Sequence, residues 1–171
     1  MTTPWRAVFL DRDGTLLEPV PYLHDPAQVR LVAGAAAALR AVRDAGFLLV
    51  VVTNQSGIGR GYFAEEDFVR VMDALERTTG VLFDGVYHCP HTPDSKCSCR
   101  KPAPGMLLAA AREHTIDLAR SFSVGDRDGD VLAGLAAGGR AVLLGPGPAP
   151  AGVLLAEDLV AAVEIILREA P

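Results

Sequence analysis

Nine residues near the start of the chain, Ala7-Val8-Phe9-Leu10-Asp11-Arg12-Asp13-Gly14-Thr15, join an apolar run to two acids and a turn. The apolar half predicts a buried β-strand, and Gly14 predicts a sharp turn after it. Because alternate side chains of an extended segment share one face, we expect Asp11 and Asp13 to project into the same crevice. One carboxylate can attack a phosphorus atom while the other handles a proton, and together they can hold a hard cation. The motif indicates phosphoryl transfer, although Asp and Gly also follow strands for turn geometry alone.

Apolar, β-rich runs alternate with helical patterns along the rest of the chain. We predict strands over residues 7–10, 48–52, 81–87, 121–124 and 141–144, and helices over 35–42, 65–75, 106–113, 130–137 and 159–167. The unbroken apolar run at 48–52 is typical of a strand buried on both faces of a parallel sheet. The alternation predicts an α/β three-layer sandwich with a parallel, Rossmann-like sheet, which binds ligands beyond the C-terminal ends of its strands.

The bulk properties of the chain restrict its class. Its 171 residues, half of them apolar, suit one domain over residues 1–171. A net charge of -5 argues against a general nucleic-acid binder. No apolar run has membrane-spanning length, and Met1-Thr2-Thr3-Pro4 lacks the features of a signal peptide. We therefore expect a cytoplasmic protein that binds neither nucleic acid nor a membrane. With the phosphoryl-transfer motif above, we also expect its substrate to be a small phosphorylated metabolite, and we expect the protein to be a monomer.

Three further polar motifs lie at or beside predicted strand ends: Thr53-Asn54-Gln55-Ser56-Gly57, Arg100-Lys101-Pro102 and Gly125-Asp126-Arg127-Asp128-Gly129-Asp130. The hydroxyl and amide of the first can donate hydrogen bonds to phosphate oxygens. Lys101 can neutralise a nucleophilic carboxylate and a bound phosphate together, and clustered carboxylates suit Mg²⁺. Each motif alone also fits a turn, a solvated basic pair or a helix cap. Their occurrence together, in this order, predicts one phosphoryl-transfer site.

The order D-x-D-G-T, then Thr, then Lys, then G-D-x-x-x-D closely resembles the haloacid dehalogenase (HAD) superfamily of phosphohydrolases across nearly the whole chain. The resemblance implies that Asp11 is the nucleophile and forms an aspartyl-phosphate. It implies that Asp13 protonates the leaving oxygen and then deprotonates the hydrolytic water. Thr53 and Lys101 would stabilise the transferring phosphoryl group. The second acid, at position 13, favours phosphatase over dehalogenase chemistry because a C–O leaving group needs a proton.

The same resemblance implies a magnesium site. Asp11, the backbone carbonyl of Asp13 and Asp126 would hold Mg²⁺, and Asp130 would support the metal shell.

A second metal site is indicated by Cys89, His91, Cys97 and Cys99, which form the pattern C-x-H-x5-C-x-C. Three thiolates and one imidazole suit a closed tetrahedral Zn²⁺ site. The alternative is three unpaired thiols beside a surface histidine. With four protein ligands and no open position, we expect the zinc to be structural and to order a loop at about residues 88–100. Arg100 and Lys101 follow the last ligand directly.

The intervals between the motifs are too short for a cap domain, so three loops must shape the substrate pocket: 18–24, 55–62 and the zinc loop. Zinc-loop HAD enzymes of this compact type fall mainly into two groups. Residues 52–61 and Tyr22-Leu23-His24 resemble the group that releases the C7 phosphate of a heptose bisphosphate. The five-residue gap between His91 and Cys97 instead resembles the histidinol-phosphate phosphatases. We predict the heptose bisphosphate as the substrate and keep histidinol phosphate as the alternative. The heptose resemblance implies that the substrate-facing residues are Tyr22, Asn54, Gln55, Ser56, Arg60, Arg100 and Arg127.

Two other classes of function fit parts of the sequence. A non-catalytic phosphate-binding or regulatory domain could keep the same scaffold, but no position of the catalytic pattern is missing. A zinc-dependent nucleic-acid module would explain the cysteines but not the acidic balance.

Overall fold

The computed structural model describes residues 3–170. The prediction that residues 1–4 are not part of a signal peptide therefore falls partly on Met1 and Thr2, which lie outside the described residues. The centre of the structure is a six-stranded sheet in which every neighbouring pair is parallel. The strand order is β3-β2-β1-β4-β5-β6. The strands are β1 (Arg6–Leu10), β2 (Phe47–Asn54), β3 (Gly85–Cys89), β4 (Phe122–Gly125), β5 (Arg140–Leu144) and β6 (Leu154–Ala156).

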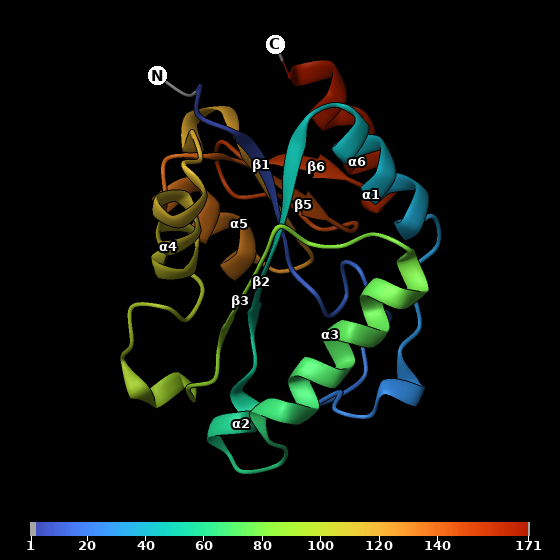
Figure 1. Cartoon of the computed structure of the whole chain (residues 1–171). Coiled ribbons are helices and arrows are strands. Elements are labelled where there is room, and N and C mark those ends of the chain that lie inside the picture. Colours follow the sequence, from blue (N-terminus) through green and yellow to red (C-terminus); the bar gives the residue numbers. More distant parts are fainter. Residues whose placement is uncertain (1–2, 171) are drawn as a thin grey trace.

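Helices cover both faces of this sheet (Figure 1). They are α1 (Ala35–Asp44), α2 (Ser56–Gly59), α3 (Glu65–Thr79), α4 (Gly105–His114), α5 (Asp128–Ala136) and α6 (Leu159–Glu169), with short 3-10 turns η1 (Pro26–Gln28), η2 (Pro93–Ser95) and η3 (Leu118–Arg120).

The alternation of side chains along β1 divides the core into two layers. Val8 and Leu10 pack in a cluster with apolar residues of α1, α3 and α6. Ala7 and Phe9 face the other way and pack with residues of α4 and α5. The predicted three-layer α/β sandwich is therefore confirmed. In α3, Phe68, Met72 and Leu75 recur at helical spacing and are all buried, as the sequence pattern predicts.

The strand order reverses beside β1, which pairs with β2 on one side and with β4 on the other. Connections from the C-terminal ends of β1 and β4 therefore diverge to opposite faces and leave a crevice between them. The chain stays attached to β4 just past the end of β1, because the Asp11 N–H donates to the Val124 carbonyl at 3.0 Å. The first acid of the motif thus stands at this switch point.

Three elements differ from the prediction for physical reasons. β3 begins at Gly85 rather than at Val81, because Val81 and Phe83 pack against the core under α3 instead of pairing with β2. Asp84 links this segment to β2, because its carboxylate accepts a hydrogen bond of 2.8 Å from the Leu49 N–H. β6 and α2 were not predicted, because three and four residues are too few to show a period.

None of the helices between residues 3 and 170 has the length and apolarity that a membrane crossing requires.

Candidate active site

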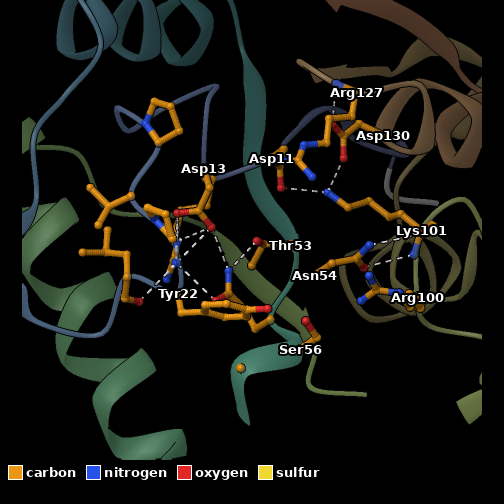
Figure 2. Close-up of a pocket in the computed structure, with 17 residues that line it drawn as sticks. Asp11, Asp13, Tyr22, Thr53, Asn54, Ser56, Arg100, Lys101, Arg127 and Asp130 are labelled. Atoms are coloured by element: carbon orange, nitrogen blue, oxygen red, sulfur yellow. Dashed lines mark hydrogen bonds and ion pairs between the residues drawn. The ribbon is translucent and has the colours of Figure 1, made fainter. Parts of the chain in front are cut away.

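A cavity of about 470 Å³ opens at the C-terminal ends of β1 and β2, beside the start of α5 (Figure 2). Most of the predicted site residues line it, although they come from five separate stretches of sequence. They are Asp11, Asp13, Tyr22, Thr53, Asn54, Gln55, Ser56, Arg100, Lys101, Arg127 and Asp130. Arg60 does not: it caps the C-terminus of α2, is exposed and is not among the residues that line the cavity.

Lys101 lies at the centre of the first of two polar networks. Its side chain is only 2% exposed, and Nζ lies 2.8 Å from Asp11 Oδ1 and 2.6 Å from Asp130 Oδ1. Nζ also donates to the Val52 carbonyl at 2.6 Å. Burial alone would lower the pKa of Lys101, but the charges of Asp11 and Asp130 outweigh it and raise the pKa. A permanent positive charge therefore sits beside Asp11.

Three acids cluster beside this one lysine. Carboxylate oxygens of Asp11, Asp126 and Asp130 all lie within 4.8 Å of one another. Burial, and then the charge of Asp11, raises the pKa of Asp126 and raises that of Asp130 to about 6. The Oδ1 atom of Asp126 is buried and has no hydrogen-bond partner among the described residues. An excess of carboxylates with an orphaned oxygen is the environment that a divalent cation neutralises.

The three acids are not equivalent as ligands. Asp130 uses one oxygen for Lys101, and its other oxygen accepts from the Arg127 N–H at 3.1 Å at the start of α5. Asp130 is thus also a helix cap, an alternative that the sequence left open. Asp126, with its unpartnered Oδ1, and the Asp11 carboxylate remain for a cation. Only glycine fits at position 14, where φ is +84° and a Cβ atom would lie 2.3 Å from Asp126 Oδ2.

The second network holds Asp13, and its main member, Arg12, was missed at the sequence level. Arg12 is 1% exposed, and its Nε and Nη2 donate to the Asp13 carboxylate at 3.0–3.1 Å. Gln55 Nε2 donates to Asp13 Oδ2 at 3.0 Å and to Thr53 Oγ1 at 2.8 Å. In Figure 2 this network lies to the left of Asp11, and Lys101 lies to the right. The only signal in the sequence was an arginine between two acids.

The side chain of Asn54 forms two hydrogen bonds with the backbone of Lys101. Its Nδ2 donates to the Lys101 carbonyl at 3.2 Å, and its Oδ1 accepts from the Lys101 N–H at 3.1 Å. The end of β2 therefore holds the segment that carries Lys101. Arg100 Nη1 donates to the His91 carbonyl at 3.3 Å, which ties this segment to the zinc loop as well.

Tyr22 stands at the exposed rim of the cavity. Its backbone has φ +50°, and its ring meets that of Tyr62 edge to face at a centroid distance of 4.8 Å.

The four predicted zinc ligands converge on one point. Sγ–Sγ distances among Cys89, Cys97 and Cys99 are 3.1–3.6 Å, and His91 Nδ1 lies 3.2 Å from the Cys99 Sγ and 3.5 Å from that of Cys89. These sulfurs are too far apart for a disulfide, with its bond of about 2.05 Å. They approach the roughly 3.8 Å spacing that Zn–S bonds of about 2.3 Å give in a tetrahedron. The donor set fits Zn²⁺.

The pKa values of the thiols differ within this cluster. Burial, and then the Cys99 thiol, raises the pKa of Cys89 to about 12. Burial opposes ionisation of Cys97 too, but hydrogen bonds from Cys99 and from the backbone lower its pKa to about 6. Cys97 is therefore the thiol that ionises most readily, whereas Cys89 becomes a thiolate only when a metal compensates its charge.

The sheet is doubly wound and carries acids after β1 and β4, a threonine at the end of β2 and a buried lysine at its switch point. This is the arrangement of a HAD-type hydrolase. In agreement, a family model described as HAD-hydrolase-like matches residues 98–163. Together with the relatives described next, this match confirms the predicted superfamily.

Individual relatives narrow the class. The D-glycero-beta-D-manno-heptose-1,7-bisphosphate 7-phosphatase of Pasteurella multocida is 48% identical over 138 residues, which cover 75% of each chain. The protein of the same name from Yersinia pestis is 46% identical over 80% of this chain and 78% of its own. The crystal structure of D,D-heptose 1,7-bisphosphate phosphatase from B. bronchiseptica, complexed with magnesium and phosphate, superposes with a TM-score of 0.89. It is 33% identical and covers 96% of this chain and 99% of its own. The chain belongs to the family of D-glycero-beta-D-manno-heptose-1,7-bisphosphate 7-phosphatases.

Proposed function

We propose that this chain is a phosphomonoester hydrolase that removes the C7 phosphate of D-glycero-β-D-manno-heptose 1,7-bisphosphate through a phosphorylated Asp11. One observation carries the proposal: Asp11, Asp13 and Lys101 line the same cavity at the switch point of the sheet. The names of the relatives that the chain matches at 48% and 46% identity support the choice of substrate.

The first step transfers the phosphoryl group to Asp11. Lys101 contacts Oδ1, so Oδ2 is the oxygen that attacks phosphorus while the bond to the C7 oxygen breaks. Asp13 supplies the proton that the departing C7 oxygen needs. Thr53 Oγ1 accepts from Gln55 and keeps its own hydrogen for a phosphate oxygen, while Lys101 balances the charge.

The second step releases phosphate. Asp13, now a carboxylate, takes a proton from water as the water oxygen attacks phosphorus. The bond between phosphorus and Asp11 breaks, and inorganic phosphate and the free carboxylate are regenerated. Both acids therefore return to their starting protonation states.

The residues fit two different cations. Asp11, Asp126 and the backbone carbonyl of Asp13 would hold Mg²⁺, in line with the orphaned Asp126 oxygen. Bound there, Mg²⁺ supplies charge neutralisation and orientation for the phosphate. Cys89, His91, Cys97 and Cys99 would hold a structural Zn²⁺ that orders the loop before Arg100.

The remaining phosphate of the substrate needs its own positive charge. Arg100 and Arg127 line the same cavity as Lys101, and guanidinium groups bind phosphate in bidentate geometry. A cavity of about 470 Å³ is of the size that small-molecule sites usually have. We assign the phosphate at C1 to these two arginines.

We also propose that residues 1–171 form one catalytic domain without a cap. In the described part of the chain, the cavity walls that flank the strand ends come from short segments: the loop at residues 19–23, Gln55 with the start of α2, and residues 100–101.

Initial rates on the heptose bisphosphate and on histidinol phosphate, with and without Mg²⁺, test the function. We expect Mg²⁺-dependent release of one phosphate, with kcat/KM for the bisphosphate at least about 10²-fold higher. Asp11→Asn should lose turnover by orders of magnitude without unfolding, whereas Asp73→Asn, on the exposed side of α3, should not. Near-normal turnover in Asp11→Asn would remove it as the nucleophile. Preference for histidinol phosphate would reassign the substrate.

A further inference from the structure

Arg12 is the largest fully buried side chain that the structure describes, yet it sits between two acids at the cavity. A buried guanidinium keeps its charge, so its position must be set by a partner. Among residues 3–170 its ion-pair partner is Asp13, with Nη2 2.9 Å from Oδ2. The guanidinium also lies over the ring of Phe68 of α3, with its Cζ atom 5.6 Å from the ring centroid. Arg12 is therefore held at its N–H edge by Asp13 and packed against an aromatic ring.

Arg12, Asp13 and Gln55 close a triangle of hydrogen bonds. Arg12 donates to Asp13, Arg12 Nη2 donates to Gln55 Oε1 at 3.1 Å, and Gln55 donates to Asp13. Gln55 is itself buried and is held by Thr53 at its remaining N–H. Each member of the triangle thus restrains the other two, and the amide of Gln55 has only one orientation that satisfies both neighbours.

The triangle leaves part of Asp13 available. Arg12 can offer its carboxylate one hydrogen from Nε and one from Nη2, because the second Nη2 hydrogen goes to Gln55. Gln55 offers one more. Three hydrogens occupy about three of the four acceptor positions of a carboxylate. The Asp13 side chain is 29% exposed and lines the cavity, so the fourth position faces the substrate.

We propose that Arg12 and Gln55 form a buried clamp that positions the carboxyl group of Asp13 for proton exchange with the leaving oxygen of the phosphate ester. Arg12 is then a positioning residue: it acts through Asp13 and not on the substrate. The inference rests on the proposed function, since it assumes that Asp13 is the acid and base. It adds that the rate of proton transfer depends on Arg12, a residue that does not contact the reacting atoms.

The clamp predicts a dependence on the leaving group. A 4-nitrophenolate is a weak base and departs without a proton, whereas phenolate and sugar alkoxides need one. The value of kcat/KM covers the steps up to leaving-group departure, so it reports the acid role of Asp13 alone. A misplaced Asp13 therefore slows phenyl phosphate more than 4-nitrophenyl phosphate. A purely structural defect lowers both rates by the same factor.

The test compares kcat/KM on the two aryl phosphates for wild type, Arg12→Lys, Arg12→Met and Gln55→Met, all with Mg²⁺. Arg12→Lys keeps the charge but loses the planar fork, and Arg12→Met keeps most of the volume. We expect the kcat/KM of Arg12→Lys to fall at least about tenfold more on phenyl phosphate than on 4-nitrophenyl phosphate. The loss should not exceed the roughly 10²–10⁴-fold that a general acid contributes in total. Gln55→Met should show a smaller change of the same sign. Asp13→Asn sets the upper limit.

Arg70→Met is the matched control, because Arg70 pairs with Asp67 on the exposed surface of α3. Its two rates should match those of wild type. Equal losses on both substrates in folded Arg12→Lys and Gln55→Met would overturn the clamp, even if Arg12→Met does not fold. A wild-type protein with no Mg²⁺-dependent hydrolysis would instead refute the proposed function, and the clamp with it.

Discussion

Replacing Lys101 by methionine removes the one positive side-chain charge that Asp11 and Asp130 share. Their side chains are 10% and 9% exposed, so both carboxylates stay buried without a partner. Breaking a buried ion pair from one side costs about 3–5 kcal/mol. A chain of this length loses about 2–4 °C in melting temperature per kcal/mol, so Lys101→Met should melt about 6–20 °C lower without metal. Turnover should fall as well, because the attacking carboxylate and the phosphate both lose their counter-charge.

Two conditions should relieve the defect. Mg²⁺ replaces the missing charge, so it should raise the melting temperature of Lys101→Met more than that of wild type. Acid should also help: burial and Asp11 already raise the pKa of Asp130 to about 6, well above its unfolded value. The folded variant then binds more protons than the unfolded chain, so its stability falls as the pH rises through this region and recovers toward pH 5.

Thermal melts of metal-free and Mg²⁺-loaded protein at pH 5 and pH 8 provide the measurement. Lys96→Met is the matched control, because Lys96 is the chain's other lysine and is exposed. Its stability should change by no more than about 0.5 kcal/mol. The reasoning fails if Lys101→Met is as stable as wild type, or if Mg²⁺ and acid shift the two proteins equally.

The other predictions concern the zinc loop and the second phosphate. Cys97→Ser should lower zinc content and melting temperature together, because metal binding supplies folding energy to the loop. Zinc analysis beside a melting curve checks this, and a zinc-free protein with unchanged stability and activity would contradict it. Arg100→Ala should reduce kcat/KM on the heptose bisphosphate by about 10–150-fold, the equivalent of a charge-assisted hydrogen bond worth about 1.5–3 kcal/mol. It should affect a simple sugar monophosphate much less, and equal losses on both would show that Arg100 does not bind the second phosphate.

Much of this fold could be predicted because its signals are local. The strand at 48–52 and the helix through Phe68, Met72 and Leu75 are set by hydrophobic period and length, and the structure contains both. The site motifs were predictable for a related reason: parallel strands bring their C-terminal ends to one edge. Any polar motif that follows such a strand is therefore carried to the same place.

What could not be predicted depends on side-chain direction. In a regular strand Arg12 would point away from Asp11 and Asp13. The strand ends at Leu10, however, and the chain bends, so Arg12 turns inward and meets its own neighbour in sequence. Asn54 was predicted to face the substrate, since its residue type fits that task. Asn54 lines the cavity, and its side chain also meets the backbone of Lys101, 47 positions away, a contact that no local pattern encodes.

The two acids of the motif show why their partners matter more than their spacing. Asp11 and Asp13 are the same residue type, two positions apart, and both line one cavity. Asp11 meets a lysine that it shares with Asp130, and it keeps one oxygen free beside two further carboxylates. Asp13 meets the guanidinium of Arg12 and the neutral amide of Gln55, away from that cluster of acids. Roles of nucleophile and of proton carrier require different environments for chemically identical groups. Here the bend after Leu10 provides them, because it sends adjacent residues of one short motif into separate networks.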